Sequence, residues 1–172
     1  MIFNNPQKIG IFSSFLSQYG SQVDALWPQI QNYEMEVIDT QHWSPILSGC
    51  VANYRPENVC DTPFFSFIGI PTNPVDVVHF IGINNSCVAT LNLTPGEMYA
   101  LIMHEIGHLI AYVNAGCKPI FRQNVSEEFF PDDCAKMLGL GNEIRSVLQT
   151  MSQSFFYTAE KQREFISRRN RL

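Results

Sequence analysis

The spacing of apolar residues predicts helices at both ends of the chain and strands between them. A first helix opens at Pro6 and is stopped by Gly20, and its apolar positions have helical spacing: Ile9, Phe12, Phe15, Leu16 and Tyr19. A second helical segment at 21–33 is broken by Trp27-Pro28. Residues 35–39 predict a short strand, and a loop-rich stretch follows at 44–58.

Three more strands are expected between residues 64 and 93. The aromatic run at 64–70 is bounded by prolines, which is typical of a buried strand. Segments 75–83 and 87–93 flank the sequence Asn84-Asn85-Ser86. Because asparagine tolerates positive φ, these two segments are predicted to form a β-hairpin.

The clearest element is a long helix that follows this hairpin. Thr94 is placed as its N-cap, Pro95 at its first position and Glu97 for a capping box. Helix-compatible residues continue to Ala115, and Gly116 supplies the C-cap. The helix is apolar nearly all round, so it is predicted to be central and buried.

Two further elements complete the predicted chain. One begins near Ser126 or Phe130 and ends at Gly139 or Gly141. A last helix at 142–170 has an apolar stripe of Ile144, Val147, Leu148, Met151, Phe155, Phe165 and Ile166. Near its end lie the basic residues Lys161, Arg163, Arg168, Arg169 and Arg171. We interpret them as solvating charges that complement the helix dipole, the alternative being contact with an anionic surface or partner.

Composition narrows the class of protein. The 172 residues, 45% of them hydrophobic, predict a single domain at 1–172, and the expected mixture of helices and strands makes its class α+β. With 11 basic against 16 acidic residues, the formal net charge of −5 argues against a nucleic-acid-binding face. We see no secretory leader and no apolar run long enough for a membrane span, so a cytoplasmic location is expected. The five cysteines form no CxxC pair and are interpreted as free thiols.

A metal-binding motif lies inside the long helix. His104-Glu105-Ile106-Gly107-His108 has the pattern HExxH. Residues four apart share one face of a helix, so both imidazoles can bind one zinc ion. Glu105 can then take a proton from a water on that ion. The competing interpretation is that both histidines are structural.

A third zinc ligand is expected, and no histidine follows the motif. It must therefore be a carboxylate from the acidic group at 126–135, which offers Glu127, Glu128, Asp132 and Asp133. The same acidic group could simply complement a helix N-terminus.

The motif HEIGH, followed by EFFPDDCA, resembles the gluzincin metallopeptidases, including the small ImmA/IrrE-type enzymes. The resemblance covers about 75–140, which would be the metallopeptidase core, and leaves 1–70 unmatched. It implies zinc on His104, His108 and Glu128, Glu105 as general base, and Asp132 hydrogen-bonded to His104. It also implies a zincin-like fold, in which a small mixed sheet with an edge-strand hairpin packs on the HExxH helix.

In such peptidases the last strand before the helix is a sheet edge that binds extended substrate, here segment 87–93. One departure is Pro131, where the family commonly has a small residue. If the following helix starts near Phe130, Glu128 falls in its lead-in, and Glu127, Asp132 and Asp133 compete as third ligand.

The sequence thus predicts a zinc-dependent peptidase acting on a protein or peptide substrate. The alternative is a zinc-binding regulatory or protein-binding module of zincin fold with little or no turnover. Tyr157, Arg122 and Arg145 are candidates for stabilising the scissile carbonyl, although a core position suits Tyr157 better. His42 and His79 are interpreted as structural histidines.

Overall fold

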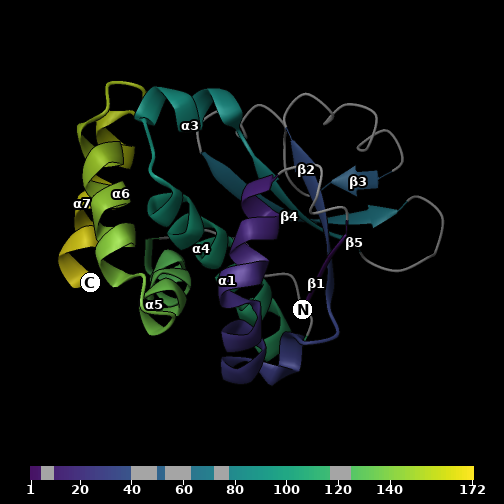
Figure 1. Cartoon of the computed structure of the whole chain (residues 1–172). Coiled ribbons are helices and arrows are strands. Elements are labelled where there is room, and N and C mark those ends of the chain that lie inside the picture. Colours follow the sequence, from purple (N-terminus) through teal and green to yellow (C-terminus); the bar gives the residue numbers. More distant parts are fainter. Residues whose placement is uncertain (5–9, 40–49, 53–62, 72–77, 117–124) are drawn as a thin grey trace. The chain divides into compact units, whose positions relative to one another are not determined.

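The computed structural model describes residues 1–4, 10–39, 50–52, 63–71, 78–116 and 125–172. The fold is α+β, as predicted. The chain forms two compact units, Met1–Thr90 and Leu91–Leu172. Figure 1 labels the helices and strands of both. The predicted metallopeptidase core at 75–140 crosses this boundary, and the single domain at 1–172 stays a prediction.

A mixed sheet occupies the first unit. In the described part its strand order is β1-β2-β5-β4-β3, formed by β1 (Ile2–Asn4), β2 (Glu34–Asp39), β5 (Val78–Ile83), β4 (Phe64–Pro71) and β3 (Cys50–Ala52). Strands β1, β2 and β5 pair in parallel, whereas β4 is antiparallel to both β5 and β3. The strands predicted at 35–39 and 64–70 are confirmed, and that at 75–83 is confirmed over its described residues. Strands β1 and β3 were not predicted, since each has three residues.

One helix, α1 (Gly10–Leu26), replaces the two helical segments predicted here. The predicted stop at Gly20 is wrong because Val23 continues the buried stripe beyond it, and this burial outweighs the roughly 1 kcal/mol that glycine costs inside a helix. The Phe12 ring packs edge-on against Phe3 of β1 and Phe64 of β4. A 3-10 turn, η2 (Pro28–Ile30), ends the segment where Trp27-Pro28 predicts a break.

The predicted hairpin of 75–83 with 87–93 is wrong. Residues Asn85–Leu91 form helix α3, and the N–H of Cys87 donates to Oδ1 of Asn84 at 3.1 Å. The asparagine pattern that suggested a turn thus caps a helix, a role for which asparagine is equally suited. The last strand before the HExxH helix is β5, which lies between β2 and β4. It is therefore no sheet edge, and the predicted substrate strand at 87–93 does not exist.

The second unit is helical in its described residues. Its elements are α4 (Pro95–Asn114), η4 (Val125–Glu128), α5 (Phe129–Met137), α6 (Gly141–Gln153) and α7 (Ala159–Arg171). The core combines side chains from several of these helices, among them Ile102, Met103, Ile106, Ile144, Val147 and Phe165. Across the described part of both units, no helix has the length and apolar character needed to cross a membrane.

The single helix predicted at 142–170 is wrong, because it breaks between α6 and α7. Thr158 starts a new helix by accepting a hydrogen bond from the Lys161 N–H. Gln162 in α7 donates back to the carbonyl of Ser154, so the two helices fold against each other. Phe155, expected in the apolar stripe, lies at this turn and is 86% exposed.

Candidate metal centre

Helix α4 places two histidines on one buried face. The predicted capping box is present, with the Glu97 N–H donating to the Thr94 hydroxyl and the Thr94 N–H donating to the Glu97 carboxylate. Gly116 follows the helix with a φ of 70°, as a C-terminal glycine should. His104 and His108 lie one turn apart, with ring centroids 4.9 Å from each other. Local sequence therefore accounts for both the helix and its pair of imidazoles.

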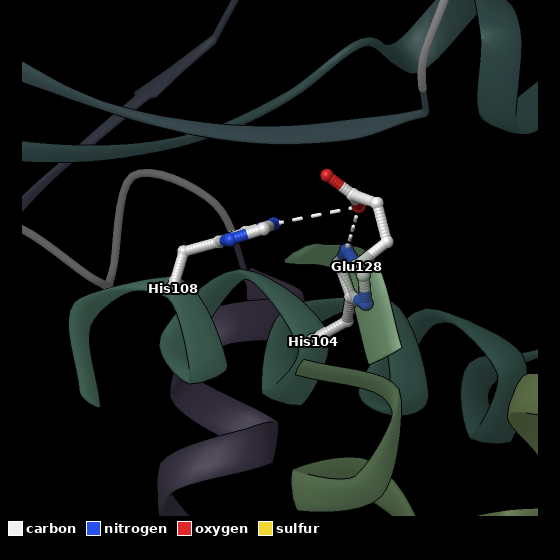
Figure 2. A group of neighbouring side chains, drawn as sticks. All are labelled: His104, His108 and Glu128. Carbon is white, nitrogen blue, oxygen red and sulfur yellow. Dashed lines mark hydrogen bonds and ion pairs between the residues drawn. The ribbon is translucent and has the colours of Figure 1, made fainter. Parts of the chain in front are cut away.

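Glu128 joins the two histidines from the end of η4. Its Oε2 atom lies 3.1 Å from Nε2 of His104 and 3.6 Å from Nε2 of His108 (Figure 2). The ligand atoms of these three residues all lie within 4.8 Å of one another, and within the described ranges they form the one group suited to a metal ion.

Two of the three separations between the ligand atoms are close to those around a zinc ion. A tetrahedral zinc ion with ligands about 2.0–2.2 Å away separates neighbouring donor atoms by roughly 3.3–3.6 Å. The two distances from Glu128 Oε2, 3.1 and 3.6 Å, are close to that separation. Two imidazoles and one carboxylate also match a catalytic zinc site that keeps a fourth position for water. Glu105 directly follows His104 in α4 and is only 6% exposed.

The lead-in position of Glu128 does not prevent this contact. Helix α5 begins at Phe129, so Glu128 is its N-cap. This agrees with the expectation that a helix start near Phe130 places Glu128 just before the helix. Pro131 falls in the first turn, where the lack of an N–H is harmless. Glu128 reaches both histidines from this position.

Helices α4 and α5 approach each other closely at Gly107 and Pro131. A Cβ atom at Gly107 would lie 2.6 Å from the Cα of Pro131 and 3.0 Å from its Cβ. Only glycine permits such proximity in α4. Glu128 lies three residues before Pro131, and Asp132 directly follows it. The contact of Pro131 with α4 therefore brings both carboxylates beside the histidines.

Asp132 makes the contact that the resemblance implies. The Nδ1 atom of His104 donates to Oδ1 of Asp132 at 2.8 Å, and the Asp132 side chain is fully buried. A histidine with its proton on Nδ1 presents Nε2 to a metal ion, and here Nε2 is the nitrogen that faces Glu128.

Arg168 completes the site from α7. It is 5% exposed, and its Nε and Nη2 atoms donate to the two oxygens of Asp132 at 2.9 and 2.7 Å. The interpretation of the C-terminal basic residues as solvating charges is therefore wrong for Arg168. The sequence contains a signal for the burial of Arg168. Arg168 lies three residues after the buried Phe165 and therefore shares its face of the helix.

Charges within the group shift the pKa values of its members. Burial and the Arg168 charge lower the pKa of His104, but hydrogen bonds to Asp132 and Glu128 outweigh them and raise it to about 9. Burial works to raise the pKa of Asp132, whereas Arg168 and His104 hold it at about 2. For Glu128, burial is likewise outweighed by the two histidines, which hold its pKa well below the usual range. The four residues thus form a network of paired charges.

The other acidic candidates have different surroundings. Oδ1 of Asp133 pairs with Nη2 of Arg171 at 2.7 Å, and Asp132 is occupied by His104 and Arg168. Glu127 is half-buried in η4 and does not belong to the three-residue group. Geometry therefore favours Glu128 as the third ligand.

The remaining candidates lie elsewhere or outside the described residues. Tyr157 is buried edge-on against Phe165, which confirms its core position, and Arg145 is exposed on α6. His79 is buried in β5, and burial lowers its pKa, as fits a structural histidine. Arg122 and His42 lie outside the described residues. Of the cysteines with described side chains, Cys87 and Cys134 take part in no disulfide, as predicted, and burial raises the pKa of the Cys134 thiol to about 12.

Comparison with protein-family models, curated proteins and solved structures finds no match for this chain. The resemblance to gluzincin peptidases therefore remains an expectation carried by two short motifs.

Proposed function

We propose that this chain is a zinc-dependent peptidase of the gluzincin type, with a zincin-like fold. His104, His108 and Glu128 hold the metal, and Glu105 is the general base. The single observation that carries this proposal is the meeting of the three ligand atoms, all within 4.8 Å of one another, two of them from the helix that also carries Glu105. Glu128 comes from a separate element, 20 residues after His108.

Each residue has a defined task in this reaction. Zinc, when bound, lowers the pKa of a water ligand to about 7. Glu105 accepts a proton from the attacking water and later donates it to the leaving amine of the cleaved peptide bond. Asp132 keeps the proton of His104 on Nδ1, so that Nε2 is available to the metal. The substrate is a protein or peptide.

The decisive experiment is the substitution Glu105→Gln. The variant should keep about one zinc per chain by native mass spectrometry, since Glu105 is not a ligand, and should lose hydrolysis of a broad peptide library. Glu160→Gln, an exposed position on α7, is the matched control and should keep both properties. Purified wild-type chain that binds no zinc would contradict the proposal and favour structural histidines.

One observation favours the alternative of a zinc-binding regulatory or protein-binding module with little turnover. Tyr157, a candidate for stabilising the scissile carbonyl, packs in the core against Phe165 instead. A wild-type chain that holds zinc but cleaves nothing in the library would support this second function. Capture of a cleavable protein by the Glu105→Gln variant would support the peptidase.

A further inference from the structure

Three nitrogen atoms of Arg168 face carboxylates of the candidate metal centre. Nε and Nη2 donate to the two oxygens of Asp132, at 2.9 and 2.7 Å. Nη1 lies 3.4 Å from Oε2 of Glu128, the oxygen that faces both histidines, and 3.6 Å from Oε1 of Glu164. The guanidinium thus connects the residue that orients His104 with the candidate third ligand.

The contact with Asp132 depends on the shape of the guanidinium. A planar fork fills both oxygens of a carboxylate at once, which a lysine ammonium cannot do in the same geometry. With both oxygens occupied, the fully buried carboxylate of Asp132 cannot rotate. Its Oδ1 atom therefore stays on Nδ1 of His104, and the imidazole keeps its orientation.

A second arginine, one turn further along α7, holds the same segment by its backbone. Arg171 donates to the carbonyl oxygen of Phe129 at 2.6 Å, and its guanidinium lies 4.5 Å from the centre of the Phe129 ring. Phe129 directly follows Glu128. Helix α7 is thereby anchored at the junction of η4 and α5, which supplies Glu128.

We propose that Arg168 is a positioning residue, which holds Asp132, His104 and Glu128 in the arrangement that binds the metal. The inference rests on the proposed metal centre and extends it to a residue outside both sequence motifs. Arg168 acts through its neighbours and takes no part in the reaction itself.

Charge and positioning predict opposite effects when Arg168 is replaced. A positive charge near a cation site weakens metal binding. If Arg168 acted through its charge alone, Arg168→Met would bind zinc more tightly than wild type. The same role leaves Arg168→Lys unchanged. A positioning role weakens zinc binding in both variants, because neither side chain can occupy both oxygens of Asp132.

The experiment measures zinc affinity of the full chain by competition with a chromophoric chelator, together with the visible absorption spectrum of the Co²⁺-substituted protein. We expect Arg168→Met to bind zinc about 10–100-fold more weakly than wild type, and Arg168→Lys to lie between them. The cobalt spectrum should change in both variants, because it reports the geometry of the ligands. Arg163→Met, an exposed arginine of the same helix, should match wild type in both measurements.

Unchanged or tighter zinc binding with a wild-type cobalt spectrum would overturn this role and leave the metal centre standing. A wild-type chain that binds neither zinc nor cobalt would overturn the centre itself, so the two failures can be told apart. Should Arg168→Met fail to fold, Arg168→Lys keeps the charge and decides the question alone.

Discussion

Replacing Gly107 with alanine tests whether the contact between α4 and α5 assembles the candidate metal centre. The new Cβ would lie 2.6 Å from the Cα of Pro131, whereas an ordinary contact begins at 3.4 Å. Because the opposing atom belongs to the backbone, no change of side-chain rotamer relieves the clash. The first turn of α5 has to move away, and Glu128 and Asp132 move with it.

Gly107→Ala is expected to change the stability of the chain only modestly and its zinc affinity strongly. Alanine inside a helix gains about 1 kcal/mol over glycine, and overpacking costs about 1–3 kcal/mol, so the metal-free chain should lose at most about 2 kcal/mol. Lengthening the contact from 2.6 to 3.4 Å is far more than the roughly 0.2 Å by which zinc–ligand distances vary. We therefore expect zinc affinity to fall tenfold or more, on the order of a lost orienting partner.

The assay combines urea unfolding in the presence of a chelator with zinc titration. Gly20→Ala is the control, since its Cβ would lie 3.7 Å from the Leu16 side chain, and it should gain about 1 kcal/mol without changing zinc affinity. Pro131→Ala combined with Gly107→Ala should not restore binding, because the Cα of residue 131 remains. A Gly107→Ala chain that is stabilised like Gly20→Ala and binds zinc like wild type would refute the reasoning.

Two further predictions concern the start of α4 and the charge of His104. Thr94→Ala removes the acceptor for the Glu97 N–H and should lower the free energy of unfolding by about 1 kcal/mol in urea unfolding, with zinc affinity unchanged. A fall in zinc affinity would show that the cap also positions the ligands. In the metal-free chain the pKa of His104 is raised to about 9, so its stabilising contribution is complete below pH 6.5 and is lost as the pH rises through 9. The Tm measured with a chelator should fall over this window in wild type but not in His104→Gln, and equal slopes would contradict the assignment.

The elements that the sequence predicted correctly are those with local causes. The capping box at Thr94 and the terminal Gly116 define α4 through residues within one turn of its ends. The spacing of His104 and His108 then follows from the helix period alone. Zinc-binding residue types on such a helix can therefore be read without knowing the rest of the fold.

The prediction failed where one local signal suits two structures. Asn84 has a side chain that can close a hairpin turn or cap a helix, and here it caps α3. Pairing of β5 with both β2 and β4 is a long-range choice that the segment itself does not encode. The partner of Arg168 is also set by a long-range contact, because Asp132 is 36 residues away. Helical spacing places Arg168 on the buried face of α7 but does not identify this partner.

Pro131 shows how such long-range contacts change the meaning of a motif. In the sequence it weakens the assignment of Glu128, because it shifts the helix start beyond the expected ligand. In the structure the same proline packs against Gly107, the small residue within HEIGH, and lies between the two carboxylates that meet His104. The departure from the family pattern and the glycine of the motif are thus two sides of one contact. Under the proposed function, this pair lets Glu128 serve as third ligand from a helix N-cap, while Arg168 of α7 binds the Asp132 carboxylate.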